Sequence, residues 1–321
     1  MNRKVLFKGI LFLLFIGVIY VACKKDSSPR KSRLTPEFKA AIEKVGRLHN
    51  SGLAKAIKDH PEWAKYWQGE FGTAKVSSFG AGFSSNKKRT LDYWGTWEGI
   101  TVTRSYFVQF TIDSLPEYTF PLAVLDTLAT YDNDYWLEPD SAIVSRINAN
   151  SPITLSSYFN YLTQELFDAI GESDYLSDFN DKLDLLLANA DYNLESDFEF
   201  YVYALGVAVA KQSAAYWNNS DNMDAWNNYL NDEDNNPLSM NVQNKRKPTL
   251  LFLQNQTPVD KIIHADIGGA LGGAIIGGFI GAAGGPPGTL AGIIGGGLTQ
   301  GARSSFSAAA KQLLKHWLSK Q

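Results

Sequence analysis

Apolar residues recur every three or four positions over most of this chain, which is the period of an amphipathic helix. The first such stretch follows Thr35-Pro36-Glu37, where a hydroxyl residue, a proline and an acid together are typical of a helix start. Asn50-Ser51-Gly52 predicts the end of this helix. Pro61 predicts a break near His60 in the segment that follows.

Three further helices are predicted between residues 155 and 218. Residues 155–170 and 176–190 each carry one apolar stripe, and residues 196–218 are apolar nearly all round, which predicts a central buried helix. Residues 218–236 are rich in Asn and Asp and predict a solvated loop with one turn around Trp226. The predicted fold class is therefore mainly α, an irregular helical bundle with a helical body over residues 35–260.

Residues 100–112 follow a different pattern. Apolar side chains alternate there with Thr, Ser and Gln, so that Ile100, Val102, Tyr106 and Ile112 share one face. This alternation predicts a short extended segment, although no partner strand is evident and a lone strand cannot form a sheet.

The strongest pattern lies near the C-terminus. Residues 267–302 include no charged side chain, and 15 of the 27 glycines fall between Gly268 and Gly301. Glycines recur at every fourth position, opposite bulky residues about 200° around a helix. The repeating glycines are Gly269, Gly273, Gly277, Gly281 and Gly285, followed by Gly288, Gly292 and Gly296.

Close packing between two such faces explains how a helix tolerates so many glycines. Each glycine costs about 1 kcal/mol against alanine in a helix interior, and contact between two glycine faces offsets that cost. Gly284-Gly285-Pro286-Pro287-Gly288 predicts a turn between the two arms. We therefore expect an antiparallel helical hairpin, a glycine zipper, over residues 261–303.

Two environments remain open for the bulky face of this hairpin. Each arm of about 16–18 residues would measure about 24–27 Å, against a bilayer core of about 30 Å, so the arms could insert into a membrane or pack on the helical body. Residues 304–321 continue as a basic amphipathic tail with Trp317, a pattern shared by interfacial helices and solvated surface helices.

The first residues have the pattern of an export signal. Arg3, Lys4 and Lys8 precede an uncharged run from Gly9 to Ala22, which is shorter than a membrane-spanning helix requires. We interpret residues 1–22 as a signal peptide and residues 23–34 as a lipidated cysteine and polar tether. Cys23 is the only cysteine in the chain and follows directly after the apolar run.

Ile19-Tyr20-Val21-Ala22-Cys23 resembles the lipobox of bacterial lipoproteins, and the following Lys24-Lys25-Asp26 is similar to the start of Bacteroidota lipoproteins. This resemblance implies acyl chains such as palmitate on Cys23 and membrane lipid as a partner. It implies a protein of the cell envelope that is lipid-anchored at the outer membrane. The protein could lie on either the periplasmic or the surface face of that membrane.

Three separated motifs resemble those of an uncharacterised family of secreted or lipid-anchored Bacteroidota proteins. They are a G-x-x-H-N motif in residues 45–50, a helix in residues 208–217 that ends in S-x-x-Y-W, and an Ala-Asp start to the glycine hairpin in residues 265–270. The resemblance implies no activity. His49 and Asn50 in the first motif are either a structural helix-end cap or a functional pair.

The net charge and the positions of the histidines argue against two further classes of function, nucleic-acid binding and metal binding. Subtracting the three basic residues of the signal from the 30 in the chain leaves 27 against 33 acids, a charge of about −6 that argues against nucleic acid as a partner. The four histidines lack metal-ligand spacing, so no metal, cofactor or catalytic residue is predicted.

Three functions remain as alternatives. The first is a non-catalytic, lipid-anchored envelope protein whose hairpin packs against or inserts into membrane. The second is a membrane-active effector, because the hairpin resembles glycine-rich segments of class II bacteriocins. The third is an enzyme with an unrecognised site near His49. Homo-oligomerisation through the glycines is also left open.

Overall fold

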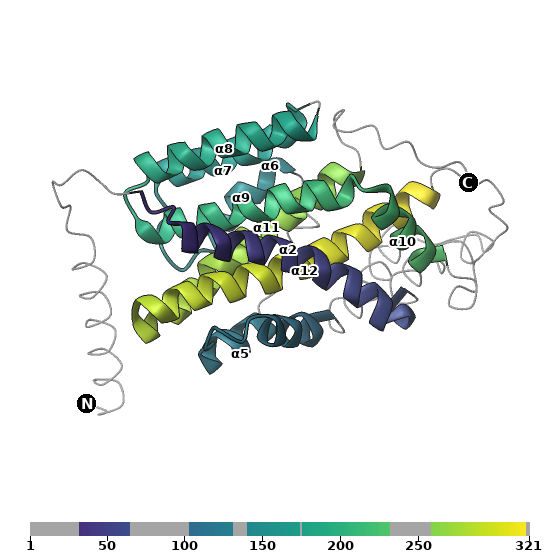
Figure 1. Ribbon diagram of the computed structural model, residues 1–321, viewed down its shortest axis with the longest axis horizontal. Helices are drawn as coiled ribbons and strands as arrows, with labels where there is room; N and C mark the ends of the chain where they lie inside the picture. The colour runs from purple at the N-terminus through teal and green to yellow at the C-terminus, as the bar shows by residue number, and fades with distance from the viewer. Residues whose placement is uncertain (1–31, 65–102, 131–139, 174, 232–257, 319–321) are drawn as a thin grey trace, which may run out of the picture.

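The computed structural model describes residues 32–64, 103–130, 140–173, 175–231 and 258–318. Helices and short turns make up this part of the chain, and no strand occurs in it, which confirms the prediction of a mainly α fold (Figure 1). The signal peptide, Cys23 and most of the tether lie outside the described residues. The labelled helices are α2 (Pro36–Asp59), α5 (Leu122–Thr130), α6 (Asp140–Asn150), α7 (Ser157–Gly171), α8 (Leu176–Asn193), α9 (Asp197–Trp217), α10 (Ser220–Asn231), α11 (Pro258–Gly281) and α12 (Gly285–Leu318). A further helix covers residues 103–114.

The first helix begins as predicted and ends later than predicted. Thr35 Oγ1 accepts a hydrogen bond from the Phe38 backbone N–H, and α2 ends at Asp59, before the 3-10 turn η1 (Pro61–Trp63). The predicted end at residues 50–52 is wrong, because α2 runs through them. Gly52 lies inside the helix, and its missing side chain makes room for the Phe110 ring, which packs 2.9 Å from where a Cβ would lie.

The three helices predicted between residues 155 and 218 are confirmed as α7, α8 and α9. The Ser156 and Ser196 hydroxyls cap the starts of α7 and α9, and α9 is buried along most of its length. The prediction of a loop with one turn around Trp226 is wrong, since α10 is a full helix. Met223, Trp226 and Leu230 lie on one face of α10 and are all buried, so packing outweighs the weak helix propensity of the Asn and Asp residues.

The predicted extended segment over residues 100–112 is also wrong for residues 103–112, and residues 100–102 lie outside the described part of the chain. Residues 103–114 form a helix, whose buried face carries Thr103, Phe107, Phe110 and Thr111. The apolar residues of this segment fit both the two-residue period of a strand and the three-to-four-residue period of a helix. Contacts with Phe306 and Thr299 of α12 select the helical period, because they bury side chains on one face of a helix.

The glycine hairpin is confirmed as two long antiparallel helices, α11 and α12, with the short 3-10 turn η4 (Ala282–Gly284) between them. The backbones touch at three glycine pairs: a Cβ would lie 2.2 Å from the facing carbonyl oxygen at Gly273, Gly277 and Gly281, which meet Gly296, Gly292 and Gly288. Gly269 instead packs on Gln300 and Ser304.

Gly285 has a different role from the one predicted. We expected it to pack in the zipper, but a Cβ at this position would find no atom within 4 Å. Its φ of 73° lies in the left-handed region, so glycine serves the turn between the arms rather than their packing.

The bulky face of the hairpin packs inside the protein. Ile267, Leu271 and Ile275 are at most 1% exposed, and Leu271 packs against Gly206 of α9. Residues 258–313 are apolar and long enough to cross a membrane, yet 67% of the most apolar window is buried in the molecule. This geometry supports the packed alternative for the body of the hairpin.

The predicted basic tail is continuous with the second arm, because α12 runs unbroken from Gly285 to Leu318. Phe306 is fully buried in an aromatic cluster with Trp63, Phe107, Trp226 and Tyr229. Arg303 is also only 2% exposed. The part of the tail up to residue 313 is therefore core and not a separate surface helix.

Candidate functional site

The three motifs that are far apart in the sequence meet at one buried point. His49 comes from α2, Ser213 and Trp217 from α9, and Asp266 from α11. Each of these four side chains is fully buried. We call this group, together with Asn50 and Ser305, the polar core cluster.

Asp266 is the acceptor at the centre of the cluster. Its Oδ2 accepts hydrogen bonds from the Ser213 hydroxyl and, at 3.1 Å, from the Trp217 indole Nε1. His49 Nε2 lies 3.8 Å from the same oxygen. One carboxylate oxygen thereby joins α11 to α9 and faces α2.

His49 and Asn50 connect α2 to α9. His49 Nδ1 lies 3.0 Å from Asn50 Oδ1, and Asn50 Nδ2 donates to the Gln212 carbonyl at 2.8 Å. Gly46 allows the close approach, since a Cβ there would lie 2.8 Å from the Ala208 carbonyl oxygen. The helix-end cap interpretation is wrong because α2 continues past both residues. The pair instead takes part in the contact between α2 and α9.

The second arm of the hairpin closes the cluster. Ser305 of α12 is fully buried near the Asp266 carboxylate, without a hydrogen bond of normal geometry. Asp266 Oδ1, His49 Nε2 and Ser305 Oγ have no hydrogen-bond partner. Buried polar atoms of this kind cost stability, so the cluster is not an optimal way to fill a core.

Burial controls the ionisation of this group. Desolvation raises the pKa of Asp266 to about 6, and it outweighs His49, Ser213, Ser305 and Trp217, which all lower that pKa. A carboxyl group with this pKa exchanges a proton near neutral pH. The cluster can therefore hold or release one proton inside the bundle.

The geometry gives no support to an enzyme site at His49. Its ring is fully buried between α2, α9 and α12, so a substrate cannot reach it in this conformation. Among the described residues, no group of three His, Cys, Asp or Glu side chains could hold a metal ion. An open surface depression of about 580 Å³ between the end of α2 and α10 has Lys58 as its one charged lining residue.

We expect the contribution of Asp266 to the stability of the protein to fall as pH rises from about 4 to about 6. The folded pKa of Asp266 of about 6 is above its ordinary value of 3.8, so the folded state binds more protons in this range. The difference corresponds to about 3 kcal/mol, present below pH 4 and lost above pH 6.

Urea unfolding of wild type and Asp266→Asn between pH 4 and pH 7 measures this effect. The amide cannot ionise, so the stability difference between the two proteins should change with pH in the predicted direction. Effects of other carboxyl groups cancel in that difference. Parallel pH profiles of the two proteins would contradict the assignment.

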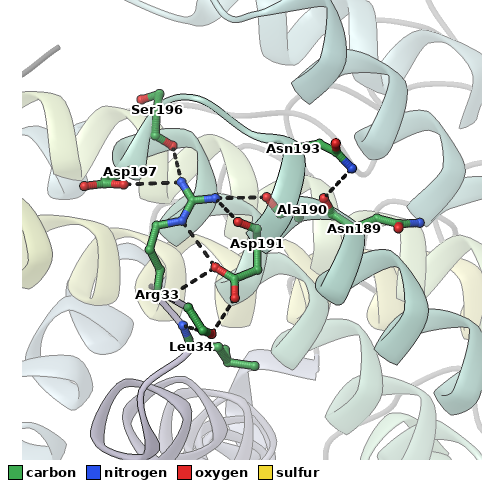
Figure 2. Close-up of polar contacts among 9 residues, drawn as sticks. Arg33, Leu34, Asn189, Ala190, Asp191, Asn193, Ser196 and Asp197 are labelled. Atoms are coloured by element: carbon green, nitrogen blue, oxygen red, sulfur yellow. Dashed lines mark hydrogen bonds and ion pairs between the residues drawn. The ribbon is translucent and has the colours of Figure 1, made fainter. Parts of the chain in front are cut away.

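A second polar group, not predicted from the sequence, fixes the start of the body. The Arg33 guanidinium donates to the backbone carbonyls of Ala190, Asp191 and Ser196, and forms ion pairs with the carboxylates of Asp191 and Asp197 (Figure 2). It also lies 4.2 Å from the Phe200 ring centre. Arginine suits this place because its fork of donors satisfies several carbonyl oxygens at the end of α8.

Comparisons with protein-family models, with curated proteins and with solved structures find no match to this chain. The resemblance to a Bacteroidota family stays a prediction. It rests on three motifs whose residues the structure brings together around Asp266.

Proposed function

We propose that the protein is a non-catalytic, lipid-anchored protein of the cell envelope, whose glycine hairpin is the core of a helical body. The observation that carries the proposal is the position of Cys23. It is the only cysteine, it follows directly after the apolar run, and it precedes a short polar tether. Several acyl chains on one residue would hold the protein on a membrane durably.

The packing of the hairpin supports this proposal over the membrane-active alternative. Insertion of whole arms would require α11 and α12 to leave the body and to expose apolar side chains of α9, such as Leu205, which packs against Gly297 of α12. Anchoring through Cys23 requires no such rearrangement. The buried hairpin then has a structural role in the body.

Replacing the lipidation site should release the protein from membranes. The test chain carries a cleavable signal peptide of the non-lipoprotein type in place of residues 1–22, together with Cys23→Ala. We expect it in the soluble fraction after cell lysis, while the native chain stays in the membrane fraction and incorporates labelled palmitate. The reason is that burial of about 0.8 kcal/mol per methylene is lost with the acyl chains.

The matched control carries the signal peptide of a known lipoprotein, with its lipobox, in place of residues 1–22, and it keeps Cys23. It should return to the membrane fraction. Wash-resistant membrane attachment of the unlipidated chain would contradict anchoring through Cys23 and would favour the hairpin as the membrane element.

A further inference from the structure

The tether joins the body at one end of the helical bundle. Arg33 is held between the end of α8 and the start of α9 through Asp191 and Asp197 (Figure 2). Because α9 has 21 residues, it ends at Trp217, about 30 Å from this point. The tether therefore leaves at the end of the molecule where α9 begins.

The turn of the glycine hairpin lies at the same end. Near its start, α11 contacts the last turns of α9, through Asp266 with Ser213 and Trp217. Near its end, Gly278 packs against Phe198 in the first turn of α9, where a Cβ would lie 2.8 Å from the ring. In Figure 1, the start of α2 and the turn before α12 both lie toward the left of the molecule.

The surface at this turn is apolar and uncharged. Ala283, Gly284, Pro286 and Pro287 are exposed, and the flanking Ile276, Phe279, Ile280 and Leu290 are half-buried. We call residues 276–290 the hairpin tip. It lies within the 36-residue uncharged segment, on a chain that carries a charge of about −6 without its signal peptide. The tip is thus an apolar, uncharged projection beside the tether.

We propose that the hairpin tip contacts the lipid bilayer next to the acylated Cys23. The proposal rests on the lipid anchor proposed above. Residues 23–31 span about 30 Å at most when extended, so the anchor keeps this end of the body close to the membrane. Moving apolar surface out of water into the interface is favourable, and no charged group of the tip opposes it. The contact is shallow, because the helices above the tip are buried in the body.

A fluorescent probe on the tip tests the contact in the complete lipidated protein. Acylation consumes the thiol of Cys23, so Ala283→Cys supplies the only free thiol for a polarity-sensitive fluorophore. The matched control is Ser220→Cys, an exposed residue at the start of α10, at the far end of α9. Both proteins are reconstituted on vesicles of phosphatidylethanolamine and phosphatidylglycerol.

We expect a vesicle-dependent blue shift and quenching by spin-labelled lipid for the probe at Ala283, and neither effect at Ser220. Pro287→Asp places a charge on an exposed tip position and should reverse the shift without changing the unfolding temperature. An undiminished shift in that variant would overturn the proposal.

Three other results would also overturn it. If the protein floats with the vesicles while both probes stay in a water-like environment, the tip contact is wrong and the lipid anchor stands. If the protein does not float with the vesicles, the anchor and the tip contact both fail. A blue shift without vesicles that grows with protein concentration would show that a second copy of the chain covers the tip.

Discussion

Gly292→Ala is expected to destabilise the protein by about 3 kcal/mol or more, at the upper end of the usual cost of overpacking. A Cβ on Gly292 would lie 2.0 Å from the Gly277 carbonyl oxygen and 2.6 Å from its carbonyl carbon. Both atoms belong to the helix backbone, so no side-chain rotation can relieve the clash. The gain of about 1 kcal/mol in helix propensity is too small to compensate.

Urea unfolding followed by circular dichroism measures this effect, with Gly284→Ala as the matched control. Gly284 lies in the same hairpin, but a Cβ there would meet no atom within 4 Å, so a change within about 0.5 kcal/mol is expected. Equal unfolding midpoints for Gly292→Ala and Gly284→Ala would show that the two arms do not pack as closely as described.

Asp266→Ala is expected to cost about 2–4 kcal/mol, because it leaves buried donors unpaired and creates a cavity. The Ser213 hydroxyl and the Trp217 indole N–H both lose their acceptor in the middle of the core. The fully buried His49 ring loses the carboxylate that it faces. The link between α9 and α11 is therefore weakened where Asp266 accepts from Ser213 and Trp217.

Thermal unfolding at pH 7.5 compares Asp266→Ala with two other variants. Asp266→Asn keeps the shape and one acceptor oxygen, so it should lose much less stability. Asp224→Ala removes an exposed carboxyl group on α10 and should change stability by no more than about 0.5 kcal/mol. If Asp266→Ala unfolds together with Asp224→Ala, then the carboxylate has no structural role in the core.

The glycine hairpin was predictable because its pattern is local. Glycine at every fourth position with bulky residues opposite defines two faces, and the turn residues between the arms fix their antiparallel order. The role of Gly285 was predicted wrongly, because spacing alone does not distinguish a packed glycine from one that supplies a positive φ. The turn also comes earlier than predicted, since α12 already begins at Gly285.

The predictions that failed depend on contacts between distant residues. Alternation over residues 100–112 predicts a strand until Thr299 and Phe306 of α12 provide the partners of a helical face. Gly52 looks like a helix end until the Phe110 ring packs on it. The sequence motifs include every residue of the polar core cluster except Ser305, but no spacing indicates that His49, Ser213 and Asp266 meet.

The place of the hairpin at the centre of the bundle also determines the order in which the protein can fold. Residues 258–318 come late in the chain, yet Leu271 and Gly297 fill the gaps beside Gly206 and Leu205 of α9. The earlier helices cannot complete a core while this segment is missing, and folding depends on contacts of large sequence separation. A chain that crosses a membrane N-terminus first would therefore stay open during transfer and close around its last two helices afterwards.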